Sequence, residues 1–267
     1  MKVLIRGAGD LASGIACRLH QCGFSIVMTD LAVPTAVRRT VAFSRAVYEQ
    51  TAEIEASTAV LCRTIGEVES ALRQDQIAVM VDPEAEIQKI WKPDVVVDAI
   101  LAKRNLGTSM QDAPVVIGVG PGFTAGEDCH CVIETKRGHY LGRCIYRGSA
   151  IPNSGVPGNI GGYTTERLLR APCAGVFEPA VSIGDLVQNG DVCGTVNGVP
   201  MRSQIPGVVR GLLQRGVMVT EGMKSGDVDP RCEPEHCHTV SDKARAIGGG
   251  VLEAILHLTR ENQKREQ

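Results

Sequence analysis

The sequence predicts an α/β domain, followed by a small domain of short strands and a single C-terminal helix. Over the first 120 residues, short runs rich in β-branched residues alternate with helical patterns, as in a parallel sheet with crossover helices. From about residue 171 to residue 230, Gly and Val recur every few positions without a helical period. After residue 250, apolar residues return at helical spacing.

The N-terminal elements follow from local patterns and predict a Rossmann-like parallel sheet. Apolar positions of residues 11–22 fall on one helical face, and Gly23 stands where a C-terminal cap belongs. Thr64 and Glu67 have the spacing of a capping box. Apolar runs without alternation, such as 95–97, are typical of strands covered on both faces. We expect strands at Val3–Arg6, Ser25–Thr29, Ile77–Val81, Val95–Asp98 and Val115–Val119, and helices at Leu11–Cys22, Thr64–Arg73 and Glu84–Trp91.

The Gly- and Val-rich region carries a weak internal repeat, in which residues 171–187 are echoed by residues 205–222. Two short-stranded halves would bury the small residues between them, with glycines in the turns. The arrangement resembles the barrel-sandwich hybrid fold of biotinyl and lipoyl domains. In those carriers a lysine stands on the turn between the halves, but residues 197–199 are Asn-Gly-Val, so a swinging-arm carrier is not expected.

Four segments are therefore predicted. Residues 1–125 form a Rossmann-like nucleotide-binding domain, residues 126–170 a connecting segment, and residues 171–230 a barrel-sandwich-hybrid-like β domain. Residues 231–267 form a linker and a helix that packs back on the N-terminal domain.

Composition excludes several classes of protein. With 28 Lys and Arg against 30 Asp and Glu, the chain offers no broad basic surface, so nucleic acid is not an expected partner. No apolar run is long enough for a signal peptide or a membrane span, so we expect a cytoplasmic protein with reduced thiols and no membrane partner.

The 30 Gly are about 11% of the chain, against a usual ~7%, which indicates loops that need backbone freedom.

The strongest motif is Gly7-Ala8-Gly9-Asp10, between the first predicted strand and the first predicted helix. Gly7 permits a tight turn, Gly9 lets a pyrophosphate approach the backbone, and the helix N-terminus presents N–H groups to the anion. Asp30, at the end of the second strand, is placed to accept from a ribose hydroxyl. The cofactor-binding residues expected here are Gly7, Gly9, Asp10, Ser13, Gly14 and Asp30.

One residue of this loop is at odds with a phosphate site. Asp10 places a carboxylate where a pyrophosphate would be repelled, unless Arg6 or another cation screens it. Alternatively, Asp10 only caps the helix through its side-chain oxygen.

A second glycine-rich loop, residues 118–126, follows the predicted strand 115–119 at the carboxyl edge of the sheet, where ligands collect in open α/β folds. Its expected ligand-binding residues are Gly120, Gly122 and Thr124. Directly after it, Cys129, His130 and Cys131 place two thiols beside an imidazole, and we take all three as candidate catalytic residues. The thiols would bind a soft metal or carry sulfur or selenium, and His130 would lower a thiol pKa. That role requires a partly exposed thiol of lowered pKa; the alternative is two buried structural cysteines.

Two polar clusters follow the β region. Cys232, His236, Cys237 and His238 are soft ligands, but structural zinc sites usually draw on two separated pairs, so no metal site is predicted. The run 227–231, Asp-Val-Asp-Pro-Arg, either serves a ligand or fixes a turn, and the residues leave both readings open.

Together these motifs resemble the YqeB-type proteins associated with selenium-dependent molybdenum hydroxylases. The first 125 residues are also similar to the nucleotide-binding domain of XdhC-type factors. The resemblance covers nearly the whole chain and is carried by residues 6–14, 34–43, 120–126, 133–139, 141–143, 153–158, 228–231 and 241–254.

The resemblance implies an accessory or maturation factor for such hydroxylases. Its ligand would be a nucleotide or the molybdopterin dinucleotide form of the molybdenum cofactor. Its expected partners are the molybdenum hydroxylase apo-enzyme or that cofactor, and a second copy of the chain is a further candidate. An NAD-dependent oxidoreductase is the alternative, because Asp30 would suit NAD. A non-catalytic scaffold that docks on the hydroxylase is the third possibility.

Overall fold

The computed structural model describes residues 1–266 and divides the chain into two compact units. The first unit consists of Met1–Pro34, Phe43–Ser154 and the chain from Val240 onward. The second unit consists of Thr35–Ala42 and Gly155–Thr239. This division differs from the four predicted segments, because residues 126–154 belong to the first unit and residues 231–239 to the second.

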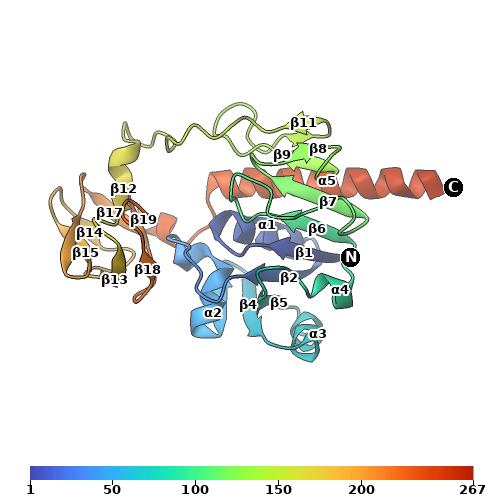
Figure 1. Cartoon of the computed structure of the whole chain (residues 1–267), viewed down its shortest axis with the longest axis horizontal. Coiled ribbons are helices and arrows are strands. Elements are labelled where there is room, and N and C mark those ends of the chain that lie inside the picture. Colours follow the sequence, from blue (N-terminus) through green and yellow to red (C-terminus); the bar gives the residue numbers. More distant parts are fainter. Residues whose placement is uncertain (267) are drawn as a thin grey trace. The chain divides into compact units, whose positions relative to one another are not determined.

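The first unit is built on a nine-stranded sheet, with the strand order β10-β9-β7-β6-β1-β2-β5-β4-β3 (Figure 1). The strands from β9 to β4 in this order are parallel to their neighbours, while β10 and β3 are antiparallel at the two edges. The bounds are β1 Lys2–Arg6, β2 Ser25–Asp30, β3 Thr51–Ile54, β4 Ser57–Cys62, β5 Ile77–Val81, β6 Val95–Asp98, β7 Val115–Val119, β9 Cys131–Ile133 and β10 Cys144–Ile145. A separate hairpin pairs β8, Thr124–Ala125, with β11, Gly148–Ser149.

The helices of this unit are α1 Asp10–Gln21, η2 Phe43–Arg45, α2 Ala46–Glu49, α3 Ile65–Arg73, α4 Gln88–Trp91 and α5 Asp242–Glu266. The five predicted strands are confirmed to within one residue, and α1 lies where the first helix was expected. The capping box is also present, because the Thr64 side chain accepts the Glu67 N–H at 3.2 Å. The Glu67 carboxylate bonds the N–H of Arg63 rather than that of Thr64.

The predicted fold class was wrong. A parallel Rossmann-like sheet followed by a biotinyl- or lipoyl-type barrel was expected, whereas the sheet is mixed and has an antiparallel strand at each edge. β3 and β4 come from residues 51–62, where no strand was predicted, and β9 and β10 from residues 131–145, beyond the expected domain end. Which strands pair is decided by side-chain packing between segments far apart in sequence, and local periodicity does not specify it.

The central strands are buried on both faces, as their unbroken apolar runs predict. On one face, Leu4 of β1 and Val96 of β6 pack with Val68 of α3 and Trp91 of α4. On the other face, α5 lies against β7, β9 and β10, and α1 packs against α5. This sheet therefore holds the ends of β1, β2 and β6 side by side at its carboxyl edge.

The helix α5 differs from the expected C-terminal helix because it begins at Asp242 and contains the triple glycine in its interior. Two of these glycines allow close packing of backbone. A Cβ on Gly248 would lie 3.1 Å from the Gly14 carbonyl oxygen, and one on Gly250 only 2.1 Å from the carbonyl oxygen of Gly142. A Cβ on Gly249 would meet no atom within 4 Å.

The second unit contains two four-stranded antiparallel sheets, β12-β19-β17-β14 and β16-β15-β13-β18. Phe177 and Leu212 are among the residues of the core that they enclose. Apart from the β15–β16 hairpin, successive strands alternate between the two sheets, so neither half of the repeat forms a sheet of its own. The bounds are β12 Leu168–Arg170, β13 Gly175–Pro179, β14 Leu186–Val187, β15 Val192–Val196, β16 Val199–Arg202, β17 Gly207–Leu212, β18 Met218–Val219 and β19 Lys224–Asp229, with short 3₁₀ helices η1 Arg39–Val41, η3 Thr165–Arg167 and η4 Pro234–Cys237.

Among residues 1–266, no helix has the length and apolar character that a membrane crossing requires.

The packing of α5 predicts opposite effects for two neighbouring substitutions. Gly250→Ala should lower the free energy of unfolding by about 1–3 kcal/mol, because the methyl group would collide with the Gly142 carbonyl. Gly249→Ala should leave it unchanged or raise it by up to about 1 kcal/mol, because Ala is the better helix former and the space is open. Urea unfolding followed by circular dichroism measures both, and equal midpoints for the two variants would contradict the packing.

Candidate functional site

The glycine loop between β1 and α1 is shaped by a turn that only glycine fits. Gly7 has φ +93°, and a Cβ there would lie 3.0 Å from the Ala99 carbonyl oxygen. Its N–H donates to the Thr29 carbonyl at 2.8 Å. Gly9 has φ −69°, which any residue adopts, and a Cβ there would meet nothing within 4 Å. Gly9 itself offers no side-chain cap to α1, but within the described residues Asp10 Oδ1 accepts the Leu11 N–H of the first turn at 2.9 Å.

The Asp30 carboxylate holds this loop in place. Its Oδ2 accepts the Ala8 N–H at 2.8 Å, and its Oδ1 accepts the Leu31 N–H at 2.7 Å. Burial raises the pKa of Asp30, and these two hydrogen bonds oppose part of that rise. The residue predicted to bind ribose therefore lies beside the loop and also anchors it.

Arg6, the last residue of β1, lies directly before the loop and is only 5% exposed. Its Nη1 donates to the Thr108 hydroxyl at 2.5 Å, and that hydroxyl donates to Asp98 Oδ2 at 2.6 Å. The Arg6 Nη1 and Asp98 Oδ2 atoms are 3.8 Å apart. The Arg6 Nε is buried and has no hydrogen-bond partner within residues 1–266. A guanidinium with a donor left over is thus held at the base of the loop.

Ser13 and Gly14, also predicted to bind the cofactor, take part in the packing of α1. The buried Ser13 hydroxyl donates to the Ala8 carbonyl at 3.2 Å and accepts the Phe43 N–H at 2.8 Å. A Cβ on Gly14 would lie 2.6 Å from the Cβ of Ala244 in α5. Ser13 therefore fixes the backbone at Ala8 and Phe43, and Gly14 allows α1 to pack closely on α5.

Lys243, in the first turn of α5, is a site residue that the sequence patterns did not indicate. It is half-buried and makes no hydrogen bond or ion pair with any described residue. Burial lowers the pKa of Lys243, while the carboxylates of Asp10 and Glu134 oppose that shift and Arg137 adds to it. The ammonium group therefore lies within the electrostatic reach of Asp10 in the glycine loop.

The second glycine-rich loop is closed by protein atoms. Gly120 has φ +85°, and a Cβ there would lie 2.8 Å from the Thr135 hydroxyl. Gly122 has φ +113°, and its Cβ would lie 2.5 Å from the backbone nitrogen of Arg104. The N–H of Thr124 donates to the Asp128 carboxylate at 2.7 Å, which fixes the turn of residues 124–128. These glycines allow the backbone to pack on neighbouring loops.

The candidate thiols lie inside the protein. Cys129 and Cys131 are both 0% exposed. Burial raises the pKa of Cys129 to about 11, and the hydrogen bond with Cys144, together with burial, raises the pKa of Cys131. The His130 Nδ1 accepts the Val116 N–H at 3.0 Å. The exposure and lowered pKa that sulfur or selenium transfer requires are absent at both thiols.

In the second unit, the Asp227–Arg231 run forms a buried ion network. Asp227 Oδ1 accepts from Arg167 Nη1 at 2.9 Å, and its Oδ2 accepts from Arg210 Nε at 2.8 Å. Asp229 pairs with Arg210 at 3.1 Å and with Arg231. Burial alone would raise the pKa of Asp229, but Arg231 and Arg210 lower it to about 2. This network ties β17, β19 and η3 together.

The Cys and His cluster does not converge on one point. Cys232 is exposed, whereas Cys237 is buried and its thiol lies 3.7 Å from the Val209 carbonyl oxygen. His236 and His238 are in or beside η4. No group of three or more possible metal ligands occurs among the described residues.

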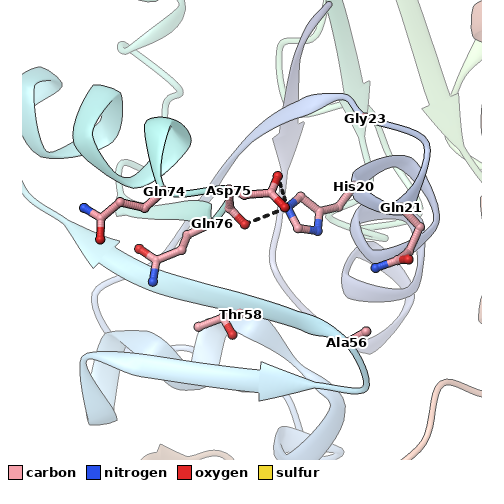
Figure 2. A pocket seen from close by; sticks show the side chains of 8 residues that line it. All are labelled: His20, Gln21, Gly23, Ala56, Thr58, Gln74, Asp75 and Gln76. Atoms are coloured by element: carbon pink, nitrogen blue, oxygen red, sulfur yellow. Dashed lines mark hydrogen bonds and ion pairs between the residues drawn. The ribbon is translucent and has the colours of Figure 1, made fainter.

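A shallow surface pocket lies at the other end of α1 (Figure 2). His20 Nε2 contacts the Asp75 carbonyl at 3.0 Å and its carboxylate at 3.4 Å, while Nδ1 lies 3.3 Å from the Ser57 hydroxyl. This order is that of a Ser-His-Asp triad, but Ser57 is only 2% exposed and does not line the pocket. The Ser57 hydroxyl is therefore not presented to the pocket as a nucleophile. Its lining residues are His20, Gln21, Gly23, Ala56, Thr58, Gln74, Asp75 and Gln76.

The residues that do come together belong to the carboxyl edge of the sheet. Gly7 and Gly9 provide the turn and the open helix terminus, Arg6 lies beneath them, and Asp30 anchors them from the neighbouring strand. Lys243 adds a cation from a helix at the far end of the sequence. Backbone N–H groups at a helix N-terminus, supported by cations, are suited to hold an anion.

Comparison with known proteins relates the chain to one curated sequence. No family model matches it. It is 51% identical over 262 residues to the "Uncharacterized protein YqeB" of Escherichia coli (strain K12). The match covers 98% of this chain but 48% of that protein, so the chain spans about half the length of this curated relative. The predicted resemblance to YqeB-type proteins is supported, and the likeness to XdhC-type factors stays a prediction.

The chain also has weak similarity to solved structures. An aspartoacylase family protein from Mesorhizobium loti is 12% identical, with 85% of this chain and 84% of that chain covered and a TM-score of 0.28. A succinylglutamate desuccinylase/aspartoacylase from Rhodobacter sphaeroides is 15% identical, with 85% of each chain covered and a TM-score of 0.28. Similarity at this level assigns no reaction.

The burial of the thiols predicts their reactivity in the native protein. Iodoacetamide at pH 8 should modify the exposed Cys22 and Cys232 quickly, whereas Cys129 and Cys131 should react only after unfolding, because both are inaccessible and protonated. Peptide mass spectrometry of native and urea-unfolded protein measures each site. Rapid labelling of Cys129 in the native protein would show that the burial is not maintained in solution.

Proposed function

We propose that this chain binds a nucleotide, or the dinucleotide form of the molybdenum cofactor, at the Gly7–Gly9 loop. We further propose that it acts in this way as an accessory factor in the maturation of selenium-dependent molybdenum hydroxylases. The observation that carries the binding proposal is the open space beside Gly9 at the start of α1, in a loop that follows directly on the buried Arg6.

The loop fits a phosphate group in shape and in charge. The space beside Gly9 is where a Cβ would otherwise stand, and a phosphate needs that space to approach the backbone. The first turn of α1 contributes the positive end of a helix dipole. The buried guanidinium of Arg6, directly before the loop, would add positive charge near the bound anion.

Asp30 supports a ribose next to that phosphate. Its two oxygens each accept one backbone N–H, and a carboxylate has further lone pairs for ribose hydroxyls. β1 lies between β2 and β6 in the sheet, and the chain leaves β1 toward β2 and leaves β6 toward β7. A crevice at such a reversal is where ligands of parallel strands bind. Because Asp30 would also suit NAD, NAD belongs among the ligands to be tested.

The maturation role is supported by the sequence. The motifs that resemble YqeB-type proteins include residues 6–14 of the loop and residues 241–254, which contain Lys243. The identity with YqeB extends over 98% of the chain. In this proposal the chain delivers or holds the cofactor by its phosphate end, and the buried Cys129 and Cys131 take no part.

Gly9→Ala tests the binding proposal without disturbing the fold. The added methyl group meets no protein atom, so the melting temperature should stay unchanged, but it would occupy the space of the phosphate. We expect at least about a tenfold loss of affinity, the size of one charge-assisted hydrogen bond. Isothermal titration calorimetry with ADP, CDP and NAD measures it, and native mass spectrometry of protein purified from its source identifies a retained ligand.

Gly66→Ala is the matched control, because Gly66 lies in α3 and its nearest atom would be 4.0 Å from the new Cβ. It should bind as the unmodified protein does. Equal affinities for the Gly9→Ala and unmodified proteins would show that the ligand does not bind at this loop.

The maturation proposal predicts a second effect of the same substitution. In cells that co-express a selenium-dependent molybdenum hydroxylase, Gly9→Ala should lower the selenium content per hydroxylase chain severalfold relative to Gly66→Ala. Elemental mass spectrometry of the purified hydroxylase measures this ratio. An unaltered selenium content would separate this chain from hydroxylase maturation even if nucleotide binding holds.

A further inference from the structure

Lys243 is the most unusual charge of the first unit. Its ammonium group is half-buried, and yet no described residue forms a hydrogen bond or an ion pair with it. Removing an ammonium from water is unfavourable unless hydrogen bonds or opposite charges replace the water. A position of this kind is typical of a group whose partner arrives with a ligand.

The carboxylates around Lys243 do not replace that water. Glu134 is 2% exposed, and its two oxygens accept the N–H groups of Lys136 at 2.7 Å and Ile151 at 2.8 Å. Asp242, the preceding residue, forms a bidentate pair with Arg137. Asp10 acts on Lys243 without forming an ion pair with it. All three donors of the ammonium group therefore remain available to a bound molecule.

The position of Lys243 is set by packing that does not depend on its charge. The next residue, Ala244, lies against Gly14 of α1, where a Cβ would come within 2.6 Å. This contact brings the first turn of α5 beside Gly14 in the second turn of α1, one turn after Asp10, which follows Gly9 directly. A cation in this place adds positive charge near the Asp10 carboxylate and so favours an anion at the loop.

We propose that the Lys243 ammonium binds a phosphate group of the ligand at the Gly7–Gly9 loop. The inference rests on the proposed function and narrows it: the ligand has an ionised phosphate or pyrophosphate at this point, and a neutral nucleoside does not suffice. Arg6 holds the anion from the β1 side and Lys243 from the α5 side. Lys243 is a binding residue, and no bond is made or broken at it.

Inorganic pyrophosphate is the probe, because it tests the phosphate subsite whatever the base of the natural ligand. Calorimetry on the full chain should give at least about a tenfold weaker affinity for Lys243→Met, and near-normal affinity for Lys243→Arg, which keeps the charge. Lys264→Met is the matched control on the same helix, since Lys264 is exposed and pairs only with Glu261 among described residues. It should bind as the unmodified protein does.

The pH dependence provides a readout that a purely structural role would not change. Burial lowers the pKa of Lys243, and the positive charge of Arg137 lowers it further. The carboxylates of Asp10, Glu134 and Asp242 raise this pKa and so oppose part of the shift. Its charge is therefore lost at a lower pH than that of an ordinary lysine, and pyrophosphate affinity should fall as the pH rises through that range. Lys243→Arg should remove this fall, because the guanidinium stays charged.

The outcomes separate the two proposals. If Gly9→Ala loses pyrophosphate and Lys243→Met keeps it, with unchanged melting temperatures, the loop binds the phosphate and the inference about Lys243 is overturned. If the unmodified chain binds neither pyrophosphate nor any of the nucleotides, the proposed function itself fails. If both variants lose binding and Lys243→Arg restores it, both proposals stand.

Discussion

The close packing of α5 on α1 and on the turn at Gly142 is the constraint on which the site depends. Gly14, Gly142 and Gly250 each stand where a side chain would collide with the opposite element. Gly142 and Gly250 meet backbone atoms and Gly14 meets the short side chain of Ala244, so α5 can lie in only a narrow range of positions. That range fixes where α5 begins, and so it fixes where Lys243 lies relative to the loop of Gly9.

A second set of contacts determines why the loop stays open at Gly9. Asp30 accepts the Ala8 N–H from its place at the end of β2, and the Thr29 carbonyl accepts the Gly7 N–H. The chain is thereby held in an extended conformation at Gly9, with φ −69° and ψ −178°, just before the helix starts. Arg6 is fixed below by Thr108 and Asp98, so its charge cannot swing away into solvent. The loop is therefore rigid before any ligand binds, which reduces the entropy lost on binding.

The glycine surplus serves two physical purposes that composition does not distinguish. Gly120, Gly122 and Gly250 let backbones approach each other closely, and the space beside them is filled by protein. Gly9 alone among these positions has open space beside it. A glycine in a loop thus indicates that another group approaches the backbone closely. The residues around it in the folded protein decide whether that group is protein or ligand.

Much of the secondary structure and one part of the site could be predicted from local sequence. The strands at 2–6, 25–30, 77–81, 95–98 and 115–119 and the capping box at Thr64 follow from periodicity and short-range hydrogen bonds. The roles of Gly7, Gly9 and Asp30 follow from fixed spacing between a strand, a turn and a helix. These features depend on residues that are near each other in the chain.

The tertiary structure decided the rest, because it depends on residues far apart in the chain. The antiparallel edge strands β3 and β10 overturned the predicted fold class, since strand pairing is a matter of packing between distant segments. The burial of Cys129 and Cys131 and the closed loop at Gly120 are likewise set by neighbours that no motif contains. Lys243 is the clearest case: the sequence by itself determined that a phosphate-type loop has an acid at Asp10. Only the folding of α5 onto α1 brought a cation within electrostatic reach of that acid.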